Sequence, residues 1–157
     1  MTDRHGQIPI RCRAVAVAVI AGKGAEARIL LLRRFGSSAE GAWSVVTGSI
    51  DPGETAPEAA RREVAEETGI TVGTLMSSGL TETFFFAPDG VMELMPIFVT
   101  FLPETVPITL DHGSDAHRWC SLEEALDIMA FAGQRRAVTD IWNDFVRREP
   151  APFRLVP

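Results

Sequence analysis

Residues 48–70 read GSIDPGETAPEAARREVAEETGI, and this stretch decides the fold because it carries the signals for both ends of one helix. Thr55 and Glu58 form a T-x-x-E capping box, with a proline between them in the first turn, where a missing N–H costs nothing. Gly69 stands where helices commonly stop, since glycine adopts the left-handed conformation freely. The spacing predicts a helix over Ala56–Thr68.

Three glutamates, Glu63, Glu66 and Glu67, fall within an arc of about 100° on this helix and line one stripe. Like charges four residues apart cost about 0.2–0.5 kcal/mol, and acids in the last turn oppose the helix dipole. The stripe continues toward the N-terminus with alanines at positions 56, 59 and 60. A solvated acidic face is the ordinary interpretation of a Glu-rich helix. An inward stripe of carboxylates instead predicts a hard divalent cation, Mg²⁺ or Mn²⁺.

The same stretch resembles the signature of the Nudix hydrolases, G-x5-E-x7-R-E-U-x-E-E-x-G-U, where U is aliphatic. The matching residues are Gly48, Glu54, Arg62, Glu63, Val64, Glu66, Glu67, Gly69 and Ile70. The resemblance implies the α/β (α+β) class, as a Nudix-type α/β/α sandwich with a mixed central sheet. We expect a single Nudix domain over residues 1–157, with extended tails at 1–10 and 150–157.

The site chemistry and the resemblance together assign roles to the signature residues of this chain. Glu63 and Glu67 are expected to hold Mg²⁺ (or Mn²⁺), which neutralises a phosphoanhydride and lowers the pKa of a bound water. Glu66 is expected to be the general base or a further metal ligand. As the resemblance implies, Arg62 orients a carboxylate by ion pairing, and Glu54 adds a ligand or braces its loop.

Four further residues are candidates for substrate binding. Arg33 and Arg34 end a predicted strand at 27–33, and guanidinium groups form bidentate bonds with phosphate, although strand-end arginines are also commonly solvated. Trp43 is either core or a base-stacking platform. Gly48 lets a backbone carbonyl approach the metal or a phosphate.

The substrate group is narrowed by residues near the signature. Thr47-Gly48-Ser49 resembles the dihydroneopterin triphosphate pyrophosphatases and related nucleoside triphosphate pyrophosphatases. Phe86 and the absence of any tyrosine disfavour the ADP-ribose and diadenosine-polyphosphate subclasses. The segment GSDAHRW departs from the Glu-His-x-x-Tyr-Arg/Lys-Trp run of the pterin group, which leaves Asp111 and Asp115 as alternatives for an extra carboxylate.

The remaining chain supplies a sheet and two helices around this helix. Expected strands cover 14–21, 27–33, 42–46, 71–86, 91–102 and 117–120, and expected helices cover 122–129 and 134–148. Three phenylalanines at 84–86 form either a core edge or a pocket wall.

Composition limits the function classes. The chain has 157 residues, is 46% hydrophobic and carries a formal charge of −6, which argues against a basic nucleic-acid surface. No apolar run is long enough to span a bilayer. Cys12 and Cys120 are too few and too distant for a disulfide framework or zinc site, so we expect reduced core thiols in a cytoplasmic protein.

These observations predict metal-dependent hydrolysis of a nucleoside diphosphate linked to another group. A (deoxy)nucleoside triphosphate or related triphosphate would give a monophosphate and pyrophosphate. The partner is a small nucleotide, without nucleic acid polymer or membrane, and the protein is a monomer or homodimer. The alternatives are a hydrolase of dihydroneopterin triphosphate or a dinucleotide, and a Nudix module that senses nucleotides without hydrolysis. Such modules usually lose signature carboxylates, which this chain retains.

Overall fold

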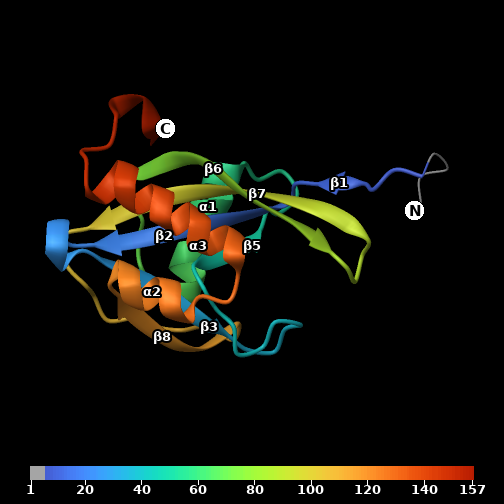
Figure 1. Cartoon of the computed structure of the whole chain (residues 1–157), viewed down its shortest axis with the longest axis horizontal. Coiled ribbons are helices and arrows are strands. Elements are labelled where there is room, and N and C mark those ends of the chain that lie inside the picture. The colour runs from blue at the N-terminus through green and yellow to red at the C-terminus, as the bar shows by residue number, and fades with distance from the viewer. Residues whose placement is uncertain (1–5) are drawn as a thin grey trace.

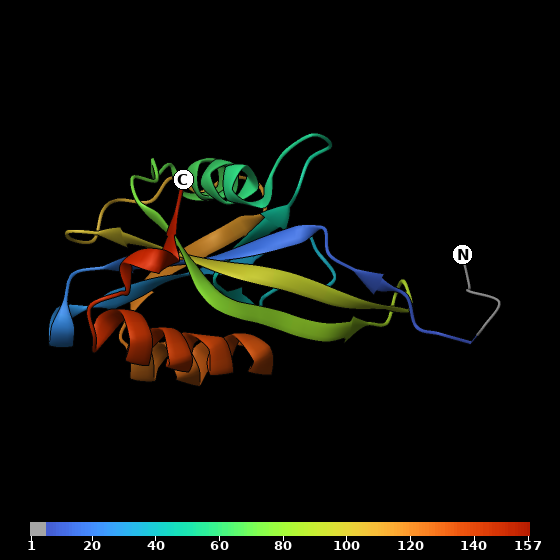
Figure 2. The same ribbon diagram turned by 90° about the horizontal axis from the view of Figure 1, so that it is seen from above.

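The computed structural model describes residues 6–157 and consists of a sheet between two helical layers. Figure 2 shows α1 (Ala56–Thr68) on one face, and α2 (Leu122–Ile128) and α3 (Ala132–Ile141) on the other. This arrangement confirms the predicted α/β/α sandwich.

Nine strands form one mixed sheet within the described residues. They are β1 (Ile10–Arg11), β2 (Ala14–Ala21), β3 (Arg28–Arg34), β4 (Trp43–Ser44), β5 (Val46–Ser49), β6 (Leu75–Phe86), β7 (Val91–Leu102), β8 (Ser114–Cys120) and β9 (Leu155–Val156). The main order is β4-β3-β2-β7-β6-β9, with β8 beside β3, β5 beside β2, and β1 beside β7. The β2–β7 and β1–β7 pairs are parallel and the other pairs are antiparallel.

Strand β2 lies at the centre and contributes to both cores. Its Val15, Val17 and Val19 pack on the α1 side, whereas its alternate residues, including Ile20, pack on the α3 side. Side chains alternate between the two faces of a strand, so an apolar run without polar interruption is typical of a strand that is covered on both faces. The sequence AVAVAVIA therefore forms a buried strand, as predicted.

Helix α1 has the predicted bounds because its end signals are local. The Thr55 hydroxyl accepts the Glu58 N–H and the Glu58 carboxylate accepts the Thr55 N–H, which completes the capping box. Gly69 ends the helix with φ of 76°, in the left-handed region. Ala59 and Ala60 are fully buried, so the small-residue stripe faces the sheet.

The single strand expected over 42–46 is two short strands. The Val45 N–H donates to the Gln134 side-chain oxygen at 3.1 Å instead of to a neighbouring strand, so the ladder is interrupted there. Residues 71–74 precede β6 rather than belonging to it. The last helix begins earlier than predicted, and its end is a π-helical turn over Trp142–Val146.

The chain ends also differ from prediction. Instead of an extended tail, residues 150–157 form a short 3-10 helix (Pro152–Arg154) and β9, which pairs with β6. The predicted tail at 1–10 lies partly outside the described residues, and its Ile10 pairs with Met92 in β1–β7 (Figure 1). Cys120 is buried as expected, but Cys12 is exposed because it lies between β1 and β2, so the prediction of a core thiol at position 12 is wrong.

Replacing Arg154 tests the docking of the C-terminal segment. Its guanidinium donates to the Ser78 carbonyl at 2.9 Å and lies over the rings of Phe145 and Phe153 at 5.8 and 5.3 Å. We expect Arg154→Ala to lower the free energy of unfolding by about 1–2 kcal/mol. Urea denaturation measures this change. Arg148→Ala removes an arginine whose side chain is 76% exposed and should change stability by less than about 0.5 kcal/mol, and equal effects of the two variants would contradict the docking role.

Candidate active site

Arg62 binds three of the four glutamates of the predicted signature. Its Nε and Nη2 donate to the two Glu54 oxygens at 2.8 and 2.9 Å, and Nη2 also donates to the Ser49 carbonyl at 2.8 Å. Its Nη1 donates to Glu63 at 2.9 Å and to Glu66 at 3.1 Å. These bonds hold the pKa of Arg62 above and that of Glu54 below their ordinary values. Arg62 therefore ties the loop before α1 to the carboxylate stripe.

Gly48 lies directly against the Glu63 side chain. A Cβ at position 48 would stand 1.9 Å from Cδ of Glu63, so a side chain there would force Glu63 out of its observed position. The absence of a side chain lets the backbone of β5 approach the carboxylate. Burial raises the pKa of Glu63, and Arg62 opposes that rise.

Glu67 is the most desolvated carboxylate of the stripe. Burial is the main cause that raises its pKa to about 8, and the negative charges of Glu63 and Asp111 add to the rise. Arg34 acts in the opposite direction. The fold thus brings together acidic groups from α1 and from the loop before β8.

These carboxylates fit a hard divalent cation by their donor chemistry. They supply oxygen ligands, and their like charges are only partly matched by Arg34 and Arg62. Within residues 6–157, no three His, Cys, Asp or Glu side chains are already gathered into a coordination cluster. Glu63 and Glu66 turn toward Arg62 instead, so binding a cation requires these side chains to rotate.

Arg34 stands between two carboxylates on opposite faces of the sheet. It donates to the Ser44 hydroxyl at 3.3 Å and to the Thr47 hydroxyl at 3.1 Å. Burial lowers its pKa, while Glu82 on β6 and Glu67 on α1 raise it. A desolvated guanidinium at this position is suited to binding a phosphate.

Arg33 lies in a different environment from Arg34. It makes two hydrogen bonds with the Asp115 carboxylate, at 2.7 and 3.1 Å, and lies 5.8 Å from the centre of the Trp43 ring. Trp43 is half-buried and packs against the α3-side core. Of the two alternatives for an extra carboxylate, Asp111 acts on Glu67, whereas Asp115 is paired with Arg33.

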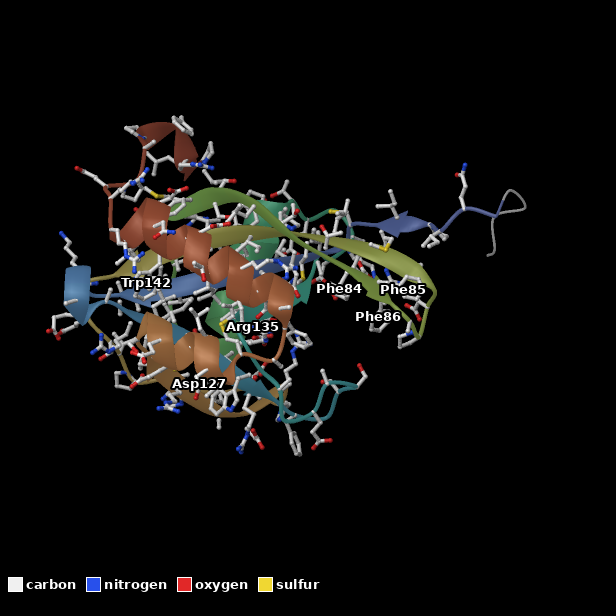
Figure 3. The ribbon with its side chains drawn as sticks, viewed as in Figure 1. Phe84, Phe85, Phe86, Asp127, Arg135 and Trp142 are labelled. Carbon is white, nitrogen blue, oxygen red and sulfur yellow. The ribbon has the colours of Figure 1, made fainter. Side chains whose placement is uncertain are left out.

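Two cavities adjoin Arg34. One, of about 610 Å³, is lined by Gly48, Glu82 and the phenylalanines of β6, and the other, of about 280 Å³, is lined by Glu67. Both include Arg34 and Thr47, so they are neighbours at one end of the sheet. Figure 3 shows residues 84–86 on the part of β6 that projects beyond α2 and α3. The pocket-wall alternative for these rings is therefore supported.

Sequence reasoning missed Glu82 and Gln134. Both are buried, and the Gln134 amide donates to Glu82 at 3.0 Å. A signal was available for Glu82, since it interrupts an otherwise apolar and hydroxylic strand, but nothing local shows which face of that strand is covered.

The fold and the signature helix define a protein of the Nudix class, and comparison with protein families agrees. The model of the NUDIX domain family matches residues 10–141. The chain belongs to the Nudix family, which confirms the resemblance found in the sequence.

Individual relatives carry different names. An octanoyltransferase of Myxococcus xanthus is 34% identical over 132 residues, which are 83% of this chain and 36% of that protein. The asymmetrical bis(5'-nucleosyl)-tetraphosphatase of Caenorhabditis elegans is 32% identical over 91 residues, which are 57% of this chain and 66% of the relative. The chain thus spans about a third of the first relative and just under two thirds of the second.

Solved structures support the same fold. The E. coli dihydroneopterin triphosphate pyrophosphohydrolase has a TM-score of 0.71 at 26% identity, with 90% of this chain and 99% of that chain covered. A C. elegans Ap4A hydrolase binary complex has a TM-score of 0.70 at 25% identity, with 83% and 94% covered.

Replacing Glu67 tests the repulsion within the stripe. A carboxyl whose pKa is raised by folding destabilises the folded state increasingly as pH rises from its unfolded pKa, about 4.3, through its folded pKa of about 8. In EDTA at pH 8, Glu67→Gln should raise the free energy of unfolding by about 1–3 kcal/mol, and at pH 5 by much less. Urea denaturation at both pH values measures this gain. Glu104→Gln, in an exposed loop, is the control, and a loss of stability in Glu67→Gln at pH 8 would refute the argument.

Proposed function

We propose that this chain is a divalent-metal-dependent pyrophosphohydrolase of nucleoside diphosphate-X compounds. The substrate is a (deoxy)nucleoside triphosphate or a related triphosphate, and the products are a monophosphate and pyrophosphate. The observation that carries this proposal is the placement of Glu67, the most buried carboxylate of the α1 stripe, in the wall of a cavity that Arg34 also lines.

The names of related proteins support the reaction class. Among the relatives are RNA pyrophosphohydrolases, one of them from Sphingopyxis alaskensis at 35% identity over 94 residues, and the asymmetrical tetraphosphatase described above. All of these names denote hydrolysis of phosphoanhydrides. The retained signature carboxylates argue against the alternative, a module that senses nucleotides without hydrolysing them.

The residues of the site have separate tasks in this reaction. Glu63 and Glu67, with Asp111, would hold Mg²⁺ or Mn²⁺, which when bound neutralises phosphate charge and lowers the pKa of water. Glu66, whose side chain is 55% exposed, accepts the proton of the attacking water or serves as a further ligand. Arg34 orients the phosphates by charge-assisted hydrogen bonds.

The helices and the composition bear on where the protein is located and what it binds. Residues 6–157 include no helix with both the length and the apolar character needed to cross a membrane. We infer a cytoplasmic location from the two unpaired cysteines, and a small nucleotide rather than a nucleic acid polymer as partner because the formal charge is −6. Whether the protein is a monomer or homodimer stays a prediction.

A substrate screen tests the proposal. Purified protein is incubated with nucleoside triphosphates, dihydroneopterin triphosphate and dinucleoside polyphosphates, with Mg²⁺ and separately with Mn²⁺. Pyrophosphate and orthophosphate are measured independently, because their ratio shows which phosphoanhydride is cleaved. We expect pyrophosphate from a triphosphate and no turnover in EDTA. Binding of nucleotides without products under both metals would favour the sensing module instead.

Glu67→Gln should reduce the metal-dependent kcat at least about 100-fold, because an amide is a poorer ligand for a hard cation. The far-ultraviolet circular dichroism spectrum should be unchanged, since the variant removes a repulsive charge. The control Glu104→Gln should retain the parent rate. Turnover by Glu67→Gln at the parent rate would show that the site is assigned to the wrong residues.

Asp111 and Asp115 form a matched pair for locating the extra carboxylate. Asp111→Asn should raise the Mg²⁺ concentration for half-maximal activity about 10-fold, because it removes a charge that acts on Glu67. Asp115→Asn frees Arg33 but leaves the carboxylate stripe intact, so it should shift this concentration less than about 2-fold. Metal titrations of kcat/KM measure both values. The reverse order of the two effects would assign the extra carboxylate to Asp115.

A further inference from the structure

Glu82 is a buried carboxylate that the proposed hydrolysis does not use. Its residue is only 4% exposed, and one of its oxygens, Oε2, accepts a hydrogen bond from the Gln134 amide at 3.0 Å. The orientation of that amide is fixed, because its oxygen accepts the Val45 N–H at 3.1 Å. Gln134 must therefore donate to Glu82, and the carboxylate has a defined position.

The second oxygen of Glu82, Oε1, is not fully enclosed by the protein. No hydrogen bond from a described residue reaches it, yet every fully buried side-chain nitrogen and oxygen among the described residues has a partner. Oε1 must therefore contact accessible space, and Glu82 lines the cavity of about 610 Å³. Gly133 at the start of α3 leaves room for the side chain, since a Cβ there would lie 3.0 Å from Cγ of Glu82.

Aromatic rings stand beside this acceptor. Side chains alternate along a strand, so Phe84 and Phe86 point to the same face of β6 as Glu82, and all three line the cavity. Two residues of a strand span about 7 Å, which is comparable to the width of a nucleobase. Phe131 also lines this cavity, with its ring centre 5.1 Å from the guanidinium carbon of Arg34. A planar heterocycle is therefore matched by ring faces and by a hydrogen-bond acceptor in one cavity.

The hydrogen-bonding character of the Glu82 Oε1 atom limits which heterocycles can bind beside it. Burial raises the pKa of Glu82, while the hydrogen bond from Gln134 and the charge of Arg34 oppose that rise and favour the ionised form. An ionised carboxylate only accepts hydrogen bonds. The edge of guanine carries two adjacent donors, N1–H and the 2-amino group. Adenine and cytosine instead present an amino donor beside a ring nitrogen that accepts, which an ionised carboxylate repels.

We propose that Glu82 is a specificity-determining residue that selects a guanine-type base by accepting hydrogen bonds from its N–H edge, with the base held against Phe84. This inference rests on the proposed function, because it places the phosphates at Arg34 and the base on the α3 side of the sheet. Glu82 touches the base and not the reacting phosphates, so its role is in binding and selection.

Glu93 is the other carboxylate that lines this cavity and is the matched control. It is 8% exposed, and its charge is matched by an ion pair with Arg11, which also binds Asp89. A base that hydrogen-bonds to Glu93 would have to compete with that guanidinium. We therefore expect replacement by glutamine to change base selection at position 82 and not at position 93.

The experiment compares kcat/KM for GTP, ITP and ATP in the full chain with Mg²⁺. The parent should prefer GTP to ATP, with ITP between them because inosine lacks the 2-amino group. Glu82→Gln keeps the bond from Gln134 but turns an amide N–H₂ toward the base. It should lower the GTP/ATP ratio at least 10-fold, mainly through KM, while kcat for ATP changes less than 2-fold. Glu93→Gln should leave the ratio unchanged.

Binding measurements separate failure of this inference from failure of the proposed function. Calorimetric titration with GMP and AMP in EDTA needs no turnover, and the parent should bind GMP more tightly, with the preference lost in Glu82→Gln. If no assay shows hydrolysis but the parent still binds GMP more tightly than AMP, the proposed enzyme activity is wrong and the role of Glu82 in base selection stands. Hydrolysis with an unchanged GTP/ATP ratio in Glu82→Gln, or a ratio that falls only in Glu93→Gln, overturns the inference.

Thermal unfolding verifies that each variant is folded. Glu82→Asp keeps the negative charge and should retain part of the preference for the guanine base.

Discussion

The confinement of Glu63 against the backbone of β5, with the buried Glu67 close enough to feel its charge, is the constraint on which the rest of this structure depends. Gly48 permits the contact because a side chain there would displace Glu63 from its observed position. Arg62 matches the charge on the loop side of the stripe and Arg34 acts on Glu67 from the sheet side. The balance is incomplete, since the pKa of Glu67 is still raised to about 8. Such stored repulsion is typical of sites whose function opposes stability.

Arg34 and Gln134 connect this repulsive cluster to the cavity on the other face. Arg34 leaves β3 where the register with β8 shifts between residues 33 and 34, and it reaches hydroxyls of β4 and β5. Gln134 interrupts the ladder at Val45 and holds Glu82 with the same amide group. The irregularity between β4 and β5 therefore lies beside Arg34 and Thr47, which both cavities at this end of the sheet share.

The sequence was sufficient wherever the signals are local. Both ends of α1 follow from residues within one turn of each end, and β2 follows from an uninterrupted apolar run. The sequence was insufficient where contacts between distant segments set the environment of a residue. The roles of Arg33 and Arg34 separate at a register shift, which no pattern within the strand reveals. Asp111 lies in the loop before β8 and acts on Glu67, whereas Asp115 lies in β8 and pairs with Arg33. The C-terminal segment gains its position from Arg154 and the β6 backbone.

The same distinction explains why family membership leaves the substrate open. The groups proposed for chemistry lie mostly within one continuous stretch, so a single motif records them. The groups that shape the base cavity are joined across long separations, as in the Glu82–Gln134 pair, whose members are 52 positions apart. Such a pair can change through substitutions that leave the helix, its caps and its carboxylates untouched. Selection of the base and the phosphate chemistry therefore use different carboxylates, Glu82 and Glu67, and Arg34 lies where both act on its charge.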